Sequence, residues 1–302
     1  MLLILTNSTD GTTDEIVRRI GTDRCFRFNI DLWRDYSVAF SASGFAIADP
    51  TGRAVASREV RACYLRKPSF DDPTGIAPGG SPEAWARSQI SYLVGEIYNW
   101  CDRDCKIRLV ERGAQQRFGK VAQMAVAAKY FSVPRWRIMW TAIGKPLNAG
   151  LSGTVVAKPL TADFVENYQF FYTTEVDPSR LDPSFPWFLQ SKIEADYDLT
   201  VVYVAGQCFG FTVERNLFEG ADWRRTINRV DLPWKPFALS PGVASSIRAF
   251  MGEARLKFGR LDFLIKGTET FFLEVNPNGQ WGWLDPRGEN GVFDAVVAEL
   301  VR

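Results

Sequence analysis

The chain has 302 residues, 46% of them hydrophobic and 24% charged, which is enough for two or three packed subdomains and excludes a disordered protein. Its 36 basic and 35 acidic residues nearly balance, which argues against capture of nucleic acid or of an anionic membrane by a global field. Histidine is absent, so Ser-His-Asp and Cys-His nucleophiles and His-ligated metals are excluded, and catalysis must rest on carboxylates, lysines, arginines and an oxygen-liganded cation such as Mg²⁺.

The first apolar run, residues 1–5, is too short for a secretory signal and lacks its charged start and cleavage site, so it predicts a buried strand. No stretch approaches the roughly 18 consecutive apolar residues that a membrane helix needs. The five cysteines are odd in number and scattered, which fits a reducing compartment better than a disulfide framework. We therefore expect a cytoplasmic protein with a small-molecule or peptide partner and without a nucleic-acid or membrane partner, and the sequence leaves a homodimer open.

The N-terminal third alternates strand and helix patterns. Strands are expected at residues 2–6, 24–28 and 62–65, a helix at 13–20, and a hairpin formed by 38–48 and 52–57. The segment 71–82 is rich in Pro, Gly and Asp and is a predicted loop. Ser81-Pro82-Glu83 supplies an N-cap, a proline at the first helical position and an early acid, which predicts that a helix begins there.

The remaining two thirds are richer in strands. After a helix near residues 118–130, strands are expected at 136–140 and 154–158, and residues 159–187 form a hairpin-like region. One helix, near 241–258, accompanies five later strands, at 187–193, 199–204, 207–215, 260–265 and 271–276. This order predicts an α+β protein of three subdomains.

The last two strands form the most informative hairpin. Because side chains alternate between faces, one face receives only apolar residues: Leu261, Phe263, Ile265, Phe271, Leu273 and Val275. The other face receives Arg260, Asp262, Leu264, Phe272, Glu274 and Asn276. A three-residue turn at 267–269 would place Asp262 directly opposite Glu274, with Cβ atoms about 4.5 to 5.5 Å apart.

Two facing carboxylates repel each other, and a bound cation would remove that repulsion. Asn276, two residues after Glu274, would then supply a third oxygen, which suits Mg²⁺. The alternative is a solvated face on which Arg260 or water satisfies the acidic pair. The residues of the hairpin alone do not separate these two interpretations.

The segment Glu274-Val-Asn276-Pro-Asn-Gly-Gln-Trp281 resembles the metal-binding strand and following loop of ATP-grasp enzymes that modify ribosomal peptides, the maturases of microviridin-like products. Other parts agree in order: a Leu-Thr pair in the first strand, Tyr64-Leu-Arg-Lys-Pro68, Lys158-Pro159 and Asp222-Trp-Arg224. The resemblance runs from the first strand to about residue 285. It implies an ATP-grasp fold with subdomains at 1–112, 113–187 and 188–302, ATP between the last two, and Mg²⁺ held on the ATP phosphates by Asp262, Glu274 and Asn276.

Two lysines are candidates for the phosphates. Lys120 lies near a predicted helix start, where an ammonium opposes the helix dipole unless an anion is bound. Lys158 ends an apolar strand, where an unpaired ammonium is costly. Each lysine could instead have no ligand. For Lys120 this is the common case, because most lysines on helices are simply solvated. The resemblance implies that both bind phosphate.

The resemblance also identifies the segment 188–194 as the linker that contacts the base. It implies that Gln190, Lys192 and Ile193 contact the adenine and that Glu194 or Asp198 contacts the ribose. Two features depart from the family. Related ligases often carry an arginine shortly after the acid of this segment, where this chain has Thr200, and the phosphate-covering loop 161–167 contains no glycine.

The implied chemistry has two steps. A substrate side-chain carboxylate attacks the γ-phosphate to give an acyl phosphate, and a hydroxyl or amine of the same peptide then displaces phosphate. Because of Thr200, an electrophilic arginine must come from elsewhere, and Arg224 and Arg215 are the candidates. The proton of the nucleophile would go to Asp198, to Asp222 or to the departing phosphate.

The resemblance implies an ATP- and Mg²⁺-dependent ligase that forms ester or amide macrocycles in a precursor peptide. The leader segment of that peptide is expected to dock near residues 159–187. One competing function is an ATP-grasp ligase that joins amino acids to a small-molecule or protein acceptor. Another is a peptide-binding protein with a degenerate nucleotide site, which Thr200 and the glycine-free loop would support.

Overall fold

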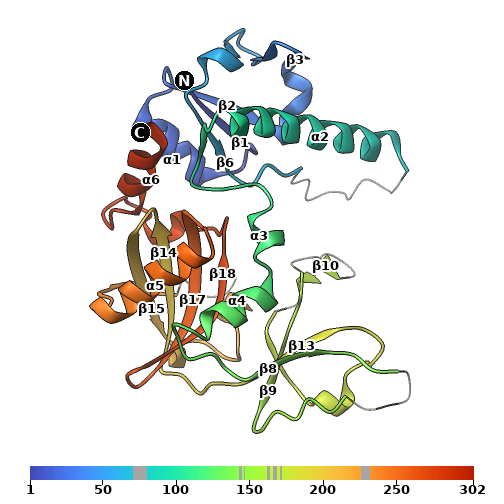
Figure 1. Ribbon diagram of the computed structural model, residues 1–302, viewed down its shortest axis with the longest axis vertical. Coiled ribbons are helices and arrows are strands. Elements are labelled where there is room, and N and C mark those ends of the chain that lie inside the picture. Colours follow the sequence, from blue (N-terminus) through green and yellow to red (C-terminus); the bar gives the residue numbers. More distant parts are fainter. Residues whose placement is uncertain are drawn as a thin grey trace.

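The computed structural model describes residues 1–70, 80–142, 145, 147–161, 164–165, 169–170, 172–225 and 232–302. Four-stranded and five-stranded sheets with flanking helices confirm the α+β class. Figure 1 shows an N-terminal part above two further β-rich parts. The helices are α1 Gly11–Ile20, α2 Pro82–Arg103, α3 Ala114–Arg117, α4 Lys120–Ala127, α5 Pro241–Glu253 and α6 Val292–Val301.

The N-terminal part is built on a parallel sheet with the strand order β2-β1-β6-β7. Its strands are β1 Leu2–Thr6, β2 Cys25–Asn29, β6 Ala62–Leu65 and β7 Ile107–Arg108. All five residues of β1 are buried, as expected for a parallel strand covered on both faces. Leu2 and Ile4 pack with α1 and α6, and Leu3 and Leu5 pack with α2.

Both α1 and α2 begin after a capping residue; α2 begins where predicted, and α1 begins at Gly11, two residues before its predicted start. The Asp10 carboxylate accepts a hydrogen bond from Thr12 N at 3.1 Å, and Ser81 Oγ accepts one from Ala84 N at 3.1 Å. Most of the predicted loop before α2, residues 71–79, lies outside the described residues.

The predicted hairpin of 38–48 and 52–57 is confirmed where residues 46–48 pair with 54–56. The predicted single strand at 38–48 is wrong, because the chain turns within it. It forms two antiparallel strands, β3 Ser37–Ser41 and β4 Gly44–Ala48, and β5 Ala54–Ala56 completes a three-stranded sheet. Gly44 has φ +126°, a conformation that L side chains rarely adopt, and this glycine was the signal for the turn.

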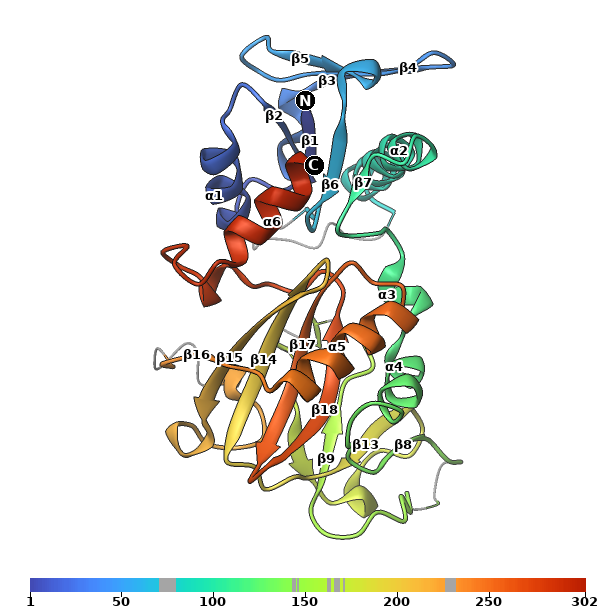
Figure 2. The same cartoon turned by 60° about the vertical axis from the view of Figure 1, so that its left-hand side comes forward.

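The central and C-terminal parts each carry an antiparallel sheet (Figure 2). The central sheet has the order β12-β9-β13-β8. Between β9 and β12 in the sequence, β10 and β11 form a separate two-stranded sheet. The C-terminal sheet has the order β16-β15-β14-β17-β18. The central strands are β8 Trp136–Met139, β9 Val155–Lys158, β10 Phe164–Val165, β11 Gln169–Phe170, β12 Thr174–Val176 and β13 Trp187–Ser191. The C-terminal strands are β14 Tyr197–Val204, β15 Gln207–Glu214, β16 Lys235–Phe237, β17 Phe258–Lys266 and β18 Glu269–Asn276.

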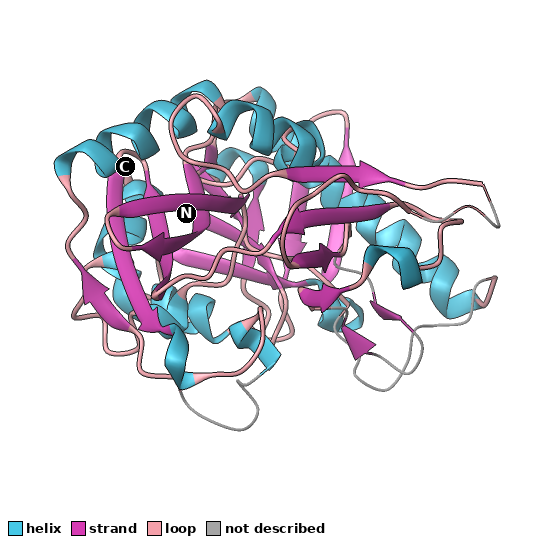
Figure 3. Cartoon of the chain, turned by 90° about the horizontal axis from the view of Figure 1, so that it is seen from below, coloured by secondary structure: helices cyan, strands magenta, loops and turns pink. Residues whose placement is uncertain are grey.

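Helices α4 and α5 cover one face of the C-terminal sheet and share its core, which contains Met124, Phe250, Phe263 and Phe272. In the view of Figure 3, helices border the strands along the upper edge of the molecule. Helix α5 ends at Glu253 rather than near residue 258, because Arg255 adopts a left-handed φ of 55°.

The last helix, α6, was not predicted. It returns to the N-terminal sheet, where Val292, Val296 and Leu300 share a core with Ile4 and Ile16. Figures 1 and 2 show the two ends of the chain close together beside this sheet. Within the described residues no helix combines the length and hydrophobicity needed to cross a bilayer.

Candidate active site

A cleft of about 290 Å³ is lined by residues of the central and C-terminal sheets and of α4. Every predicted site residue except Glu194 lines it: Lys120, Lys158, Gln190, Lys192, Ile193, Asp198, Arg215, Arg224, Asp262, Glu274 and Asn276. The fold therefore gathers residues that span more than half of the chain into one place.

The register of the β17-β18 hairpin places Asp262 opposite Glu274, as predicted. The path to that register differs from the prediction, because the turn has two residues, Gly267 and Thr268, and a bulge interrupts the ladder after Asp262. The shorter turn and the bulge each shift the register by one residue and cancel. Between them the faces are exchanged, so Phe272 lies in the core and Leu273 lines the cleft.

The two carboxylates have separate protein partners. Glu274 accepts a hydrogen bond from Lys120 Nζ at 2.9 Å. Asp262 accepts hydrogen bonds from Thr200 Oγ1 at 2.7 Å and from Arg260 Nη2 at 2.9 Å. Burial alone would raise the pKa of Glu274, but Lys120, Lys158 and Arg224 outweigh it and hold that pKa well below its usual range. Glu274 is therefore ionised at neutral pH.

The donor set fits a hard divalent cation. Asp262, Glu274 and Asn276 present oxygen atoms on adjacent strands, and each carboxylate oxygen keeps a further lone pair. Within the described ranges no group of three Cys, Asp or Glu side chains is close enough to hold a metal. A cation here would therefore depend on the Asn276 amide and on oxygens of a bound phosphate.

Lys120 faces Glu274 because α4 is fixed to β18. Gln123, buried in that helix, accepts a hydrogen bond from Val275 N at 3.0 Å and donates one to Phe118 O at 2.9 Å. The ammonium is thus held over the carboxylate face of the hairpin.

Lys158, at the end of β9, is 91% buried, and its ammonium has no hydrogen bond or ion pair with any described residue. Burial lowers its pKa to about 8, although Glu274 partly offsets this effect. A buried ammonium without a protein partner, in a cleft with a second lysine, indicates an anionic ligand.

The affinity for ATP is expected to fall about tenfold between pH 7 and pH 9, because Lys158 loses its proton in the free protein at about pH 8. Replacing Lys158 by Ala should weaken binding at pH 7 by about 1 to 3 kcal/mol and abolish this pH dependence. The measurement is calorimetric titration at fixed Mg²⁺. An unchanged affinity or the same pH slope in Lys158→Ala would show that this ammonium does not contact phosphate.

Loss of the Lys158 proton, which is expected to weaken ATP binding, is expected to increase the stability of the fold. The pKa of Lys158 is lower in the folded state than its ordinary value of 10.5, so the unfolded state holds the proton more tightly. The contribution of Lys158 to stability therefore rises as the pH increases from about 8 to 10.5.

Four apolar side chains also line the cleft: Val156, Ile193, Leu264 and Leu273. Gln190 is fully buried in β13 and its Nε2 has no hydrogen-bond partner among the described residues. An unsatisfied buried amide beside an apolar slot fits the edge of a planar base. Val156, Leu264 and Leu273 were missed because an apolar residue in a strand signals only a core.

The predicted adenine and ribose ligands Lys192, Glu194 and Asp198 differ in their surroundings. Lys192 N donates to Thr154 O at 2.8 Å, while its Nζ lies 2.7 Å from Glu175 and 2.9 Å from Glu194, which raises its pKa. The Glu194 side chain is 72% exposed and does not line the cleft. Asp198 does line it, so only one of the two predicted ribose ligands faces the cavity.

Two arginine–aspartate pairs line the cleft. Arg224 binds Asp222 with a fork, Nε to Oδ1 at 2.8 Å and Nη2 to Oδ2 at 2.7 Å. Arg215 donates to Asp198 Oδ2 at 2.7 Å and to Gly220 O at 2.9 Å. Burial raises the pKa of Asp198 to about 6, against the opposing effect of Arg215, whereas the pKa of Asp222 is lowered because Arg224 outweighs its burial.

The predicted phosphate-covering loop is only partly within the described residues, which omit 162–163 and 166–167. The structure does describe the other departure from the expected pattern, Thr200, and gives it a role. Its hydroxyl supports Asp262, so the residue that replaces the expected arginine belongs to the carboxylate cluster.

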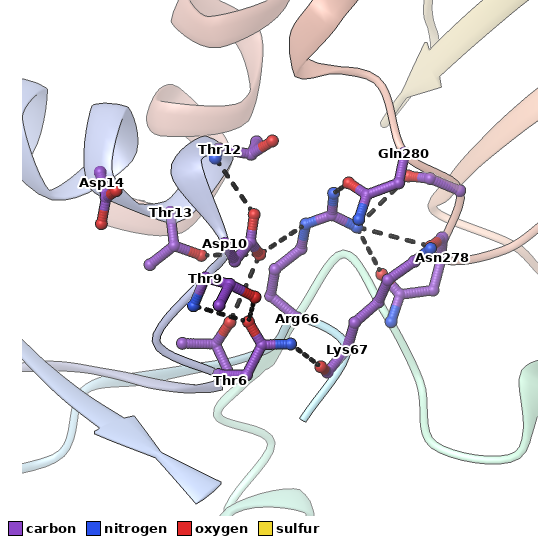
Figure 4. Close-up of polar contacts among 12 residues, drawn as sticks. Thr6, Thr9, Asp10, Thr12, Thr13, Asp14, Arg66, Lys67, Asn278 and Gln280 are labelled. Carbon is purple, nitrogen blue, oxygen red and sulfur yellow. Dashed lines mark hydrogen bonds and ion pairs between the residues drawn. The ribbon is translucent and has the colours of Figure 1, made fainter. Parts of the chain in front are cut away.

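A second, larger cleft of about 710 Å³ lies at the carboxyl ends of β1 and β6. Beside it Arg66, which is fully buried, reaches from β6 to the loop after β18 (Figure 4). Its Nη1 donates to Asn278 Oδ1 at 3.1 Å and to Gly279 O at 3.3 Å, and its Nη2 contacts Gln280 Oε1. Its Nε lies 3.3 Å from Asp10 Oδ2.

This network was missed by the sequence analysis, although Arg66 carried the same signal as Lys158, a cation that directly follows an apolar strand. Arg66 fixes the loop that begins with Asn276. Gln280 O in turn accepts a hydrogen bond from Arg260, the partner of Asp262. The N-terminal part of the chain is therefore linked to the carboxylate cluster by continuous hydrogen bonds.

The structure is similar over nearly its whole length to several solved proteins. One is a Chryseobacterium gregarium RiPP-associated ATP-grasp ligase in complex with ADP and a leader and core peptide, with TM-score 0.79, 20% identity, and coverage of 99% of this chain and 96% of that one. Another is the macrocyclase MdnC from Microcystis aeruginosa bound with precursor peptide MdnA, with TM-score 0.79, 19% identity and 99% coverage of both chains. The D-alanine–D-alanine ligase of Bacillus anthracis, complexed with ATP, is more distant, with TM-score 0.55, 10% identity and coverage of 100% of this chain and 96% of that one.

No protein-family model matches the sequence, and no curated protein matches it either. The structural likeness nevertheless establishes the architecture. The chain has the ATP-grasp fold, which confirms the predicted fold class.

Proposed function

We propose that this ATP-grasp chain is a ligase that uses ATP to form ester or amide cross-links between side chains of a ribosomally made precursor peptide. The observation that carries the proposal is the cleft in which Lys120, Lys158, Asp262, Glu274 and Arg224 converge. The subdomain boundaries 1–112, 113–187 and 188–302, a cytoplasmic location and leader docking near residues 159–187 belong to the same proposal.

In this proposal the adenine contacts Gln190 and Ile193, while Glu194 and Lys192 form an outer ion pair. Lys120 and Lys158 bind the phosphates. Mg²⁺ held by Asp262, Glu274 and Asn276 would neutralise the charge that develops on the transferred phosphoryl group. The ionised state of Glu274 and the depressed pKa of Lys158 both support an ionic ligand between them.

The reaction proceeds in two balanced steps. A carboxylate oxygen of the peptide attacks the γ-phosphorus, the bond to ADP breaks, and an acyl phosphate forms. A hydroxyl or amine then attacks the acyl carbon, loses its proton and expels inorganic phosphate. Arg224 donates to Asp222 through Nε and Nη2, so Nη1 has no partner among the described residues, which supports the assignment of Arg224 as the arginine that stabilises the acyl phosphate.

Asp198 is the better-placed candidate for the general base. Its pKa of about 6 lies near the operating pH, where proton transfer is most efficient. Asp222 has a lowered pKa and both of its oxygens bind Arg224. We therefore assign Asp222 to holding Arg224 and Asp198 to accepting the proton, with Arg215 as its positioning partner.

A peptide substrate is favoured over a free amino acid by the comparisons. The structures with TM-scores of 0.70 or more are described as complexes with precursor or leader peptides or as macrocyclases, whereas the D-alanine–D-alanine ligase reaches 0.55. A degenerate nucleotide site loses one of its two supports, because Thr200 donates a hydrogen bond to Asp262.

The test uses a precursor peptide encoded next to this chain, rich in Thr, Ser or Lys and in Asp or Glu. Incubation with ATP and Mg²⁺ is expected to release one ADP and remove the mass of one water for each cross-link, and deletion of the leader should slow both greatly. Mass spectrometry and an ADP assay measure the two quantities. An unchanged mass with a free amino acid joined to the peptide would indicate an intermolecular ligase, and peptide binding without ADP release would indicate a binding protein.

A further inference from the structure

The buried guanidinium of Arg66 depends on the loop that follows β18 for most of its partners. Four of its acceptors lie in three consecutive residues of that loop: Asn278 O and Oδ1, Gly279 O and Gln280 Oε1. Asp10 supplies the one carboxylate beside it (Figure 4). Because the guanidinium is cut off from water, a displaced loop would leave its donors without acceptors, which is costly. Arg66 therefore determines where this loop lies.

The loop is also packed tightly against β17 and β18. Gly279 is buried, and a Cβ at this position would lie 2.8 Å from Arg260 Cβ and 3.3 Å from Asn276 Cβ. These separations are shorter than normal contacts in a protein interior, so only glycine fits without a shift of its neighbours. The loop is thus in contact with the hairpin and bonded to Arg66 at the same time.

The conformation of the loop orients the side chain of Asn276, one of the three predicted cation ligands. Asn276 Oδ1 accepts a hydrogen bond from Asn278 N at 3.1 Å, and Asn276 O accepts one from Gly279 N at 3.2 Å. An amide oxygen has two lone pairs, so Oδ1 can still bind a cation. The two residues that position this amide are the ones whose oxygens bind Arg66.

The same loop supports a second ligand, Asp262. Arg260 donates from Nη1 to Gln280 O at 3.2 Å and from Nη2 to Asp262 Oδ2 at 2.9 Å. The third ligand is held differently, because Glu274 bonds to Lys120 on α4. Displacement of the loop would therefore disturb two of the three ligands.

We propose that Arg66 is a positioning residue for the cation site: it fixes the loop that orients Asn276 and Asp262, so that the N-terminal part of the chain determines the affinity for Mg²⁺. This inference rests on the proposed function, which supplies the cation, and deepens it. Arg66 does not line the cleft of the candidate active site, and it acts through the loop rather than on the reacting atoms. The competing interpretation is that Arg66 only joins two parts of the fold.

The test replaces the buried pair as a unit, by combining Arg66→Gln with Asp10→Asn. The double variant leaves no buried carboxylate unpaired, and Asn is also a good N-cap residue for α1. Mn²⁺, which prefers the same oxygen ligands as Mg²⁺, is titrated into the full chain with ADP and followed by electron paramagnetic resonance. The affinity for Mn²⁺ is expected to fall about tenfold or more, the scale for losing an outer partner of metal ligands. The affinity for ADP without a divalent cation should be unchanged.

Kinetics separate positioning from general loss of structure. In the double variant the Mg²⁺ concentration that gives half-maximal peptide-dependent ADP release should rise about tenfold, while kcat at saturating Mg²⁺ is largely retained. A protein that is only partly folded would show the reverse, a lower kcat with an unchanged requirement for Mg²⁺. Circular dichroism measures the folded fraction.

A second variant acts on the loop without touching the buried pair. In Gly279→Ala the added methyl group presses on Arg260 and Asn276, so the affinity for Mn²⁺ should fall as in the double variant. The matched control is Arg19→Gln. Arg19 also joins the N-terminal part to a C-terminal element, through Asp294 of α6, and within the described residues it bonds to no part of the loop. The control should bind Mn²⁺ like the wild type.

Wild-type affinity for Mn²⁺ in the folded double variant would overturn the inference, and Gly279→Ala decides in the same way if the double variant does not fold. An equal loss in Arg19→Gln would also overturn it, because the effect would then come from loosened contact between the two parts. Lack of Mn²⁺ binding by the wild-type protein would overturn the cation site itself. Failure of the proposed peptide reaction is seen separately, as a wild-type protein that binds Mn²⁺ but forms no cross-link.

Discussion

Replacing Asp262 by Asn, or Glu274 by Gln, is expected to lower peptide-dependent ADP formation at least about 100-fold, the scale for losing a preorganised charge at a phosphoryl-transfer site. Each change keeps the shape of the side chain and removes one negative charge. In Glu274→Gln the ammonium groups of Lys120 and Lys158 also lose their shared counter-charge. The measurement is steady-state ADP release at saturating peptide across a range of Mg²⁺ concentrations.

Glu269→Gln supplies the control for both variants. Glu269 belongs to the same hairpin but is exposed, bonds to Ser132 and does not line the cleft. It should leave ADP release unchanged, and circular dichroism should show that all three variants fold. Near-normal turnover in either cleft variant would remove that carboxylate from the metal site.

Arg224→Lys is expected to lower the rate of cross-link formation by about 100- to 1000-fold, the range for removing one preorganised oxyanion donor. Lysine keeps the positive charge, so Asp222 stays paired, but it lacks the planar fork that binds Asp222 and still presents Nη1. The loss should appear in kcat for the peptide product rather than in the KM for ATP. Product mass and ADP release, followed together, measure it.

Arg225→Lys is the matched control, because Arg225 follows Arg224 in the same short 3₁₀ helix and does not line the cleft. Arg215→Lys separates the two arginine candidates. If Arg215→Lys loses product formation while Arg224→Lys retains it, the roles of the two arginines are exchanged.

The pairing of Asp262 with Glu274 in the β17-β18 hairpin was predicted correctly, although the turn from which it was predicted is wrong. Alternation of apolar and polar residues identified the two strands, but the pairing of Asp262 with Glu274 was deduced from a three-residue turn that the structure does not have. The turn has one residue fewer than expected and the bulge adds one, and no local pattern predicts a bulge. The prediction failed only between these two features, at Phe271, Phe272 and Leu273.

Long-range partners were the least predictable part of the site. Lys158 and Arg66 each follow an apolar strand, which shows that each cation needs a partner but not which partner. Thr200 was a departure from the expected pattern in the sequence, yet in three dimensions it supports Asp262 from the neighbouring strand. Such assignments require the sheet order, because β14 and β17 are separated by more than fifty residues.

Helix α6 was missed because its apolar pattern has no nearby partner in the sequence. It packs on β1, β6 and α1, and its apolar face is complementary to elements made at the other end of the chain. Periodicity indicates an amphipathic helix, but it does not identify the surface that the helix covers.

The closure of the N-terminal sheet by α6 bears on how the protein folds during synthesis. Ile4 and Ile16 leave the ribosome early, while Val292 and Val296, which cover them, appear only after residues 66–291 have been made. At roughly 5 to 20 residues per second, that interval lasts about 10 to 50 s. During this time α1 covers that face of the parallel sheet without α6, so the first subdomain to be translated is among the last to complete its core, and the order of synthesis does not set the order of folding.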